Sequence, residues 1–255
     1  KHALVTGGGR GLGFEIAMRF GLEGARLSII EYNGGLLEET RGKLERAGIE
    51  INPCLADVSK RDEVERAVTK AENFAPIDVL VNNAGVAEET PFLRIEEEEW
   101  RRILDINLTG SFFVAQAVCR YMARRQSGVV INMSSKNGLD AEFGYAHYNA
   151  SKAGVILLTK TMAVELAHLN IRVNAVCPGY LVTPMSMEID SPEFARDFVE
   201  RYIPINRPGS VADVAPMFLF LAGEESAFIT GQVFVIDGGQ LAGQKPATRL
   251  LQKAL

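Results

Sequence analysis

Short apolar runs recur along the chain and alternate with longer stretches of helical periodicity. The runs are four to six residues long, and most lack the polar alternation of a strand with one solvated face. Each is followed by glycines or polar residues, which is typical of strands buried on both faces of a parallel sheet. The predicted strands cover residues 2–5, 26–30, 51–56, 78–81, 128–133, 171–176 and 232–236.

The segments between these runs carry the period of amphipathic helices. Helical stretches end at residue 20, cover 34–47, begin near 59, and cover 96–125, 147–169 and 211–222, whereas residues 180–207 are the least regular part. Strands that alternate with helices at this spacing predict an α/β fold with a doubly wound parallel sheet. Because neither a repeat nor a linker interrupts the pattern, residues 1–255 are expected to form one domain.

A glycine-rich segment lies between the first predicted strand and its helix. It reads Thr-Gly-x-x-x-Gly-x-Gly over residues 6–13. Glycines let the backbone approach a phosphate, and a helix N-terminus offers free N–H groups to it. Two better-known motifs do not fit, since no register matches G-x-G-x-x-G and a P-loop needs lysine where Phe14 stands. The flanking strand and helix favour an anion cradle over a merely flexible turn.

Polar residues follow the carboxyl ends of the other predicted strands, which is where open α/β sheets bind ligands. Glu31 ends the second strand, 18 residues after Gly13 (31 − 13). A carboxylate near this spacing suits the ribose hydroxyls of an unphosphorylated adenosine, although an exposed turn glutamate is the alternative. Asn107 is a further polar residue in an apolar setting, and a mid-helix asparagine there indicates a kink or a site.

Tyr148 and Lys152 lie four residues apart within the predicted helix 147–169. Residues at this spacing share one helix face, so the hydroxyl and the ammonium group can point into the same space. A cation beside a phenol favours the phenolate and lowers its pKa from about 10, which suits acid/base chemistry near neutral pH. A buried tyrosine with a snorkelling lysine is the alternative that this pair alone leaves open.

Composition excludes several other classes of protein. The 255 residues are 47% hydrophobic with a formal net charge of −5, and no basic stripe indicates nucleic-acid binding. The three cysteines and three histidines lack metal-ligand spacing, and the sparse cysteines indicate a reducing compartment. No apolar stretch is long enough to span a membrane, and no signal-peptide pattern opens the chain. A cytoplasmic protein without metal, membrane or nucleic-acid partners is expected.

Taken together, these motifs resemble those of the short-chain dehydrogenase/reductase family. The resemblance extends from about residue 3 to 239 and rests on residues 6–13, Asp57, residues 82–85, Asn107, Ser135, Tyr148 with Lys152, and Pro178-Gly179. It implies a single-domain Rossmann-like fold with a seven-stranded parallel sheet, a nicotinamide cofactor and a homotetramer. The tail at 240–255 lies outside it.

The resemblance also implies four catalytic roles. Tyr148 resembles the family's general acid/base, and Lys152 the residue that lowers its pKa and holds the nicotinamide ribose. Ser135, 13 residues before Tyr148 (148 − 135), is preferred to Ser134 as the hydroxyl that positions the substrate oxygen. Asn107 resembles the fourth member, which anchors a water leading from Lys152 to solvent.

The cofactor contacts implied by the same resemblance are spread over most of the predicted strand ends. They are Gly7, Arg10, Gly11, Leu12, Gly13, Glu31, Asp57, Val58, Asn83, Ala84, Gly85, Tyr148, Lys152, Pro178, Gly179 and Thr183. Glu31 would repel the 2′-phosphate of NADP, whereas Arg10 could pair with it. Because no second basic residue follows Glu31, NAD is expected rather than NADP.

The expected activity is hydride transfer between NAD(H) and a secondary alcohol or ketone, with Tyr148 moving the proton. Two alternatives are a dinucleotide-binding sensor without turnover and a reductase of carbon–carbon double bonds. The complete catalytic set argues against the sensor, and the standard Tyr-x-x-x-Lys spacing argues against the second. Residues 180–207 are expected to form an irregular lid over the substrate.

Overall fold

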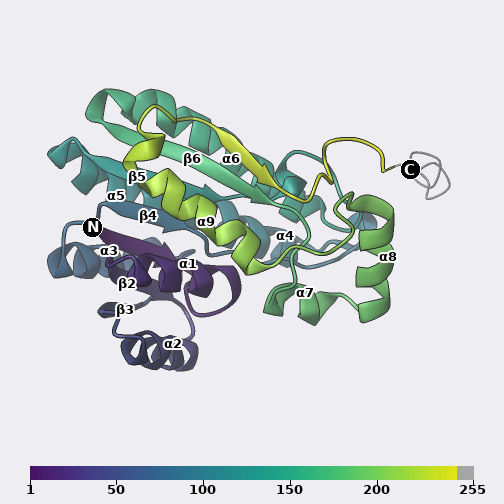
Figure 1. Cartoon of the computed structure of the whole chain (residues 1–255), viewed down its shortest axis with the longest axis horizontal. Coiled ribbons are helices and arrows are strands. Elements are labelled where there is room, and N and C mark those ends of the chain that lie inside the picture. Colours follow the sequence, from purple (N-terminus) through teal and green to yellow (C-terminus); the bar gives the residue numbers. More distant parts are fainter. Residues whose placement is uncertain (246–255) are drawn as a thin grey trace.

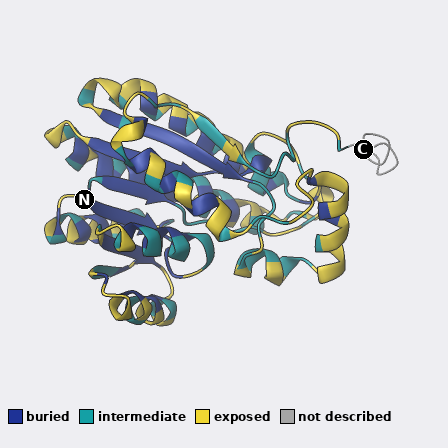
Figure 2. Ribbon diagram, viewed as in Figure 1, coloured by how far each residue is buried: buried dark blue, intermediate teal, exposed yellow. Residues whose placement is uncertain are grey.

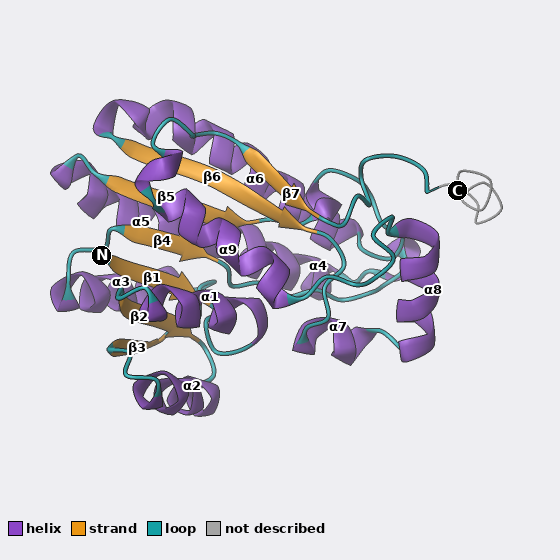
Figure 3. Ribbon diagram, viewed as in Figure 1, coloured by secondary structure: helices purple, strands orange, loops and turns teal. Residues whose placement is uncertain are grey.

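A seven-stranded parallel sheet forms the centre of the structure, a computed structural model that describes residues 1–245 (Figure 3). The end of the tail, residues 246–255, lies outside the described residues. The predicted seven-stranded sheet is confirmed, and each strand bound lies within two residues of its prediction. The strands are β1 His2–Thr6, β2 Arg26–Glu31, β3 Ile51–Leu55, β4 Val79–Asn82, β5 Gly128–Met133, β6 Ile171–Pro178 and β7 Val233–Ile236.

The strand order is β3-β2-β1-β4-β5-β6-β7. The chain therefore builds the sheet outward from β1 to β3, then crosses back and places β4 on the other side of β1, so the strand order reverses between β1 and β4. Their register pairs Ala3 with Val79 and Val5 with Val81. Both strands are fully buried, which explains their continuous apolar sequence. Ligands of open α/β sheets bind beyond the carboxyl ends of strands at such a reversal.

Helices cover both faces of the sheet and bury two separate apolar cores (Figure 2). On one face lie α1 Gly11–Leu22, α2 Gly34–Arg46 and α9 Val211–Ala222. On the other lie α3 Arg61–Phe74, α5 Gly110–Arg125 and α6 Ala146–Leu166. Short 3₁₀ turns occur at Phe92–Arg94, Lys136–Gly138, Ala167–Leu169 and Glu224–Ser226. Within residues 1–245, no helix is both long and apolar enough to cross a membrane.

The helix predicted over 96–125 is interrupted at its polar residue. It consists of α4 Glu97–Leu104, a π-helical turn Asp105–Thr109 and α5. Asn107 lies in the middle of the turn and is fully buried. π-turns inside α-helices are rare and occur often at functional sites, so the asparagine does mark a local distortion.

Residues 180–207 are more regular than the sequence pattern predicts. They contain α7 Pro184–Ile189 and α8 Pro192–Tyr202, which Figure 1 shows beyond the arrowheads of the strands. Thr183 caps α7 and Ser191 caps α8, each followed by proline at the first helical position. This cap-then-proline pattern is a helix start signal that hydrophobic periodicity misses.

Candidate active site

Four side chains from three parts of the chain converge beyond the carboxyl ends of β4 and β5. Ser135 follows β5, Tyr148 and Lys152 lie on the first turns of α6, and Asn107 lies in the π-turn. The Ser135 hydroxyl lies near that of Tyr148, and the ammonium of Lys152 lies 5.6 Å from the centroid of the Tyr148 ring. The structure thus brings the four predicted catalytic residues together, whereas their roles stay predictions.

The side chain of Asn107 is fully engaged by protein groups. Its Oδ1 accepts from the Val86 N–H at 2.8 Å, and its Nδ2 donates to the Val86 carbonyl at 2.9 Å and to Ser151 Oγ at 3.1 Å. The π-turn therefore fastens the segment after β4 to α6. A Cβ on Gly85 would lie 3.2 Å from Asn107 Oδ1 and 3.3 Å from Lys152 Nζ, so only glycine leaves both groups undisturbed there.

Burial dominates the electrostatics of the Tyr148–Lys152 pair. It raises the pKa of Tyr148 to about 12, although the nearby Ser135 side chain acts in the opposite direction. Burial also lowers the pKa of Lys152 to about 8. The expected lowering of the tyrosine pKa by lysine is therefore wrong for the chain by itself. Lys152 donates to the Met133 carbonyl at 3.1 Å, and burial of the phenol outweighs the opposing effect of Ser135.

The glycine loop between β1 and α1 has the shape of a phosphate cradle. Gly7 and Gly11 have φ angles of +63° and +57°, which other residues rarely adopt. A Cβ on Gly13 would lie 2.2 Å from the Gly7 carbonyl oxygen, whereas one on Gly11 would meet only Pro184 at 3.4 Å. Since α1 begins at Gly11 without a side-chain cap, the N–H groups of its first turn are available to an anion. Leu12 lies in that turn.

Asn83 holds the end of β4 against this loop. Its Nδ2 donates to the carbonyls of Thr6 at 3.0 Å and Gly7 at 3.1 Å. In return, Thr6 Oγ1 accepts from the N–H groups of Asn83 and Ala84, both at 3.0 Å. The predicted cofactor residues of β1 and β4 therefore form one cross-linked edge, which fits a dinucleotide lying across it.

Glu31 is buried at the end of β2 and points back at the glycine loop. Its carboxylate accepts from the N–H groups of Gly9 at 3.3 Å, Tyr32 at 3.0 Å and Asn33 at 3.2 Å. This rules out the simple exposed-turn alternative. Its oxygens can accept further hydrogen bonds, as recognition of ribose hydroxyls requires.

Asp57 and Val58 follow β3 at the same edge. Oδ1 of Asp57 accepts from the N–H of Ser59 at 2.9 Å and from its hydroxyl at 2.7 Å. Val58 is buried, and a Cβ on Gly110 would lie 2.9 Å from its side chain. The packing of Val58 against α5 thus fixes the position of the neighbouring Asp57 backbone.

The remaining predicted cofactor residues lie on the other side of the reversal. Pro178 ends β6, and Gly179 donates its N–H to the Ile236 carbonyl at 2.9 Å. A Cβ on Gly179 would lie 2.6 Å from that of Asp237. Thr183 accepts the Ser186 N–H at 3.2 Å as the cap of α7.

Two side-chain contacts near these residues, one ion pair and one hydrogen bond, were not predicted from the sequence. Arg10 of the glycine loop pairs with Glu188 of α7, and the buried His147 pairs with Glu99 of α4. In each case the partners are far apart in the chain, 178 and 48 residues, so no local pattern links them. Only the tertiary fold brings them together.

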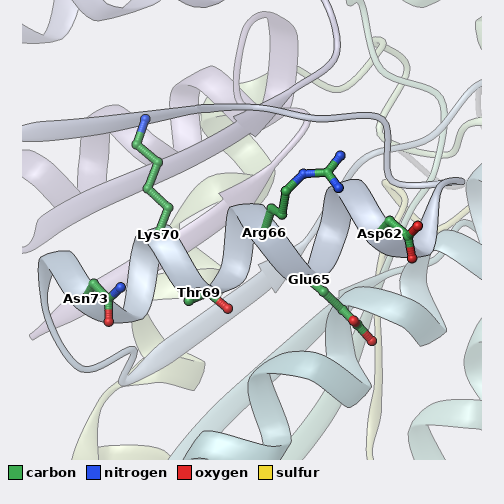
Figure 4. A pocket seen from close by; sticks show the side chains of 6 residues that line it. All are labelled: Asp62, Glu65, Arg66, Thr69, Lys70 and Asn73. Atoms are coloured by element: carbon green, nitrogen blue, oxygen red, sulfur yellow. The ribbon is translucent and has the colours of Figure 1, made fainter.

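A surface hollow elsewhere carries no comparable chemistry. Figure 4 shows its six lining side chains, all from α3: Asp62, Glu65, Arg66, Thr69, Lys70 and Asn73. They form the solvated face of one helix and are remote in sequence and in element from Tyr148. Among residues 1–245, no group of three or more histidine, cysteine or acidic side chains is placed to hold a metal ion.

Comparisons with known proteins agree with this geometry. The sequence model of the short chain dehydrogenase family matches residues 1–193. A 3-oxoacyl-[acyl-carrier-protein] reductase, FabG, of Thermotoga maritima is 40% identical over 240 residues, which cover 94% of this chain and 97% of that protein. The 3beta-hydroxysteroid dehydrogenase 1 of Eggerthella lenta is 39% identical, with coverage of 94% and 93%.

A solved structure gives the same result. The gluconate 5-dehydrogenase from Burkholderia cenocepacia, determined in complex with NADP and tartrate, matches with a TM-score of 0.91 at 32% identity. The match covers 95% of this chain and 96% of that one. The similar proteins therefore share architecture and family but carry names that refer to different substrates.

Proposed function

The chain belongs to the short-chain dehydrogenase/reductase family, and from this premise we propose that it transfers a hydride between NAD(H) and a secondary alcohol or ketone. Membership of this family establishes an oxidoreductase that acts on alcohol or ketone groups with a nicotinamide dinucleotide. The convergence of Ser135, Tyr148, Lys152 and Asn107 at one sheet edge supports the proposed hydride transfer to or from a secondary alcohol or ketone.

The nicotinamide ring supplies or accepts the hydride. During ketone reduction, Tyr148 donates its phenolic proton to the substrate oxygen, and the Ser135 hydroxyl donates a hydrogen bond to the charge that develops there. Because burial raises the pKa of Tyr148 to about 12, the phenol is protonated near neutral pH and ready for this direction. One ammonium proton of Lys152 is committed to Met133, which leaves two for a ribose hydroxyl or a water.

NAD is proposed over NADP because of two carboxylates near the adenosine side of the site. Glu31 is buried and faces the glycine loop, where a 2′-phosphate would meet a like charge. Arg10, the one basic residue of that loop, is paired with Glu188. The similar Burkholderia structure holds NADP, so the preference of this chain rests on its own residues.

Residues 180–207 are proposed to form the lid over the substrate. The segment carries Thr183, lies beyond the strand ends and contacts the glycine loop through the Arg10–Glu188 ion pair. Within this segment, α8 packs on Tyr180, which precedes α7, through the ring of Phe198, whose centroid lies 5.1 Å from that of the Tyr180 ring. α8 and the residues before α7 thus share one aromatic cluster, which suits a segment that opens and closes as a unit.

The two alternative functions predict different results in one assay. A sensor would bind the dinucleotide without turnover, and a reductase of carbon–carbon double bonds would consume reduced cofactor only with unsaturated substrates. The test is absorbance of reduced cofactor with ethyl acetoacetate, cyclohexanone, 5-ketogluconate and cyclohexenone, with both NADH and NADPH. We expect turnover of at least one saturated ketone and a higher kcat/KM with NADH. Binding without turnover of any saturated ketone would overturn the proposal.

A further inference from the structure

The first turn of α6 is capped by an unusual group. Tyr148 is the third residue of this helix, so its N–H has no partner within the helix. The N-cap residue, Tyr145, provides no side-chain hydrogen bond. Instead, the Tyr148 N–H donates to Nδ1 of its neighbour His147 at 2.8 Å. A fully buried imidazole therefore accepts the hydrogen bond that an N-cap side chain would otherwise accept.

This hydrogen bond fixes the tautomer of His147. Since Nδ1 accepts, the ring proton must be on Nε2. Nε2 lies 2.6 Å from Oε1 of Glu99 on α4, to which it donates. A protonated ring, or the opposite tautomer, would direct an N–H at the N–H of Tyr148. The carboxylate of Glu99 selects the form of the ring that can cap the helix.

Glu99 is itself held in place by the loop before α4. Burial opposes its charge, but hydrogen bonds from Thr90 and His147 outweigh that effect and keep the pKa of this carboxyl below its ordinary value. The Thr90 N–H donates to the Gly144 carbonyl at 2.8 Å. The chain of contacts from Thr90 through Glu99 to His147 thus ties the loop before α6 to the start of that helix.

We propose that His147 and Glu99 are positioning residues for Tyr148, an inference that rests on the proposed function. Neither needs to touch the substrate, because both act through the backbone of the residue that carries the phenol. Without the cap, the first turn of α6 frays and the hydroxyl shifts relative to Ser135. A displacement of about 1 Å at a reacting group can lower turnover by about 10²-fold.

Two substitutions at His147 separate its two hydrogen bonds. Asparagine places an acceptor near the position of Nδ1 and retains the cap, whereas glutamine places a donor near Nε2 and retains only the bond to Glu99. We expect kcat within about threefold of wild type for His147→Asn and about 10- to 100-fold lower for His147→Gln. The dissociation constant of NADH, measured by fluorescence, should be unchanged in both.

Two substitutions at Glu99 test the choice of tautomer. Glu99→Gln retains an oxygen that accepts from Nε2 and should keep kcat within about threefold. Glu99→Leu removes the acceptor, frees the ring to change tautomer and should lower kcat as His147→Gln does. His168→Gln, in the exposed 3₁₀ turn that follows α6, is the matched control and should behave as wild type.

The tautomer can also be read without turnover. In the full-length protein labelled with ¹⁵N-histidine, the shifts of His147 should show Nε2 protonated in wild type and the opposite tautomer or a mixture in Glu99→Leu. If wild type turns over none of the ketones above, the proposed function fails while this measurement still tests the cap. A wild-type Nδ1–H ring, equal losses of kcat in the two His147 variants, or losses that follow thermal stability would each overturn the inference.

Discussion

Arg10 and Glu188 form a bidentate ion pair that joins the glycine loop to α7. Nη1 of Arg10 lies 2.5 Å from Oε1 of Glu188, and Nη2 lies 3.3 Å from Oε2. The hydrogen bonds raise the pKa of the arginine and lower that of the carboxyl. The only basic group of the loop is therefore directed at the lid, and a 2′-phosphate would compete with Glu188 for it.

Glu188→Gln should shift cofactor preference toward NADP. The amide leaves Arg10 without a charged partner, so its guanidinium becomes available to the 2′-phosphate. We expect the ratio of the NADP to the NAD dissociation constant to fall about threefold, as suits an exposed pair. Glu193→Gln removes another exposed carboxylate, paired with Arg196 on α8, and should leave the ratio unchanged. Identical ratios in all three proteins would contradict the assignment.

Glu31→Ser should have a larger effect in the same direction. Serine removes the buried charge that faces the ribose while leaving a hydroxyl. Repulsion between this carboxylate and a 2′-phosphate in a partly buried site is worth about 1–3 kcal/mol. Removing it should therefore raise kcat/KM for NADP relative to NAD about 5- to 150-fold. Steady-state kinetics on one substrate measures the ratio. A wild type that prefers NADP would show that Glu31 is not the selector.

Tyr148→Phe should abolish most of the activity and little else. The substitution removes only the hydroxyl, so folding and NADH binding should persist while kcat falls about 10²- to 10⁴-fold. Tyr121→Phe on α5, whose hydroxyl lies 3.4 Å from Thr69, serves as the control. If Tyr148→Phe kept more than about a tenth of the wild-type rate, another group would have to be the acid/base.

The fold was predictable because the strands of a parallel sheet are apolar throughout and end in recognisable residues. β1 with its glycine loop and β6 with Pro178-Gly179 are found correctly from the sequence, and Asn107 marks its own π-turn. α7 and α8 escaped prediction because they are short, and their capping signals are stronger than their periodicity. Local sequence patterns were therefore enough to predict the strands and helices that bury a whole face, but not the short helices α7 and α8.

The electrostatics of the site were not predictable from spacing. Tyr148 and Lys152 are four residues apart, which places them together but does not give the cost of burying both. That cost depends on β5, on Met133 and on the helix packing around α6, none of which is local in sequence. For the same reason the pairing of His147 with Glu99 required the folded chain.

Burial of Lys152 should appear as a pH dependence of stability. Its pKa is lowered from 10.5 to about 8 in the folded chain. Between these values the unfolded state binds more protons, so stability rises with pH across this window, and the cost of the buried cation is fully present below pH 8. Relative to Lys152→Met, wild type should gain up to about 3 kcal/mol from pH 7.5 to 10.5. Urea unfolding at several pH values measures this, and parallel curves for the two proteins would contradict it.

Assembly into a homotetramer is expected to use α5 and α6. The outer faces of these helices expose large apolar side chains, among them Leu157 at 65% and Val164 at 83% on α6 and Phe112 at 37% on α5. Apolar side chains grouped on neighbouring helices are typical of a surface that another subunit covers. Leu157→Asp should therefore convert the assembly to smaller species in light scattering at micromolar concentration, because a carboxylate would be buried between subunits. Leu22→Asp, at a leucine that is 66% exposed on α1, is the matched control and should leave the assembly intact. A wild type that is a strict monomer, or equal effects of the two substitutions, would place the interface elsewhere or remove it.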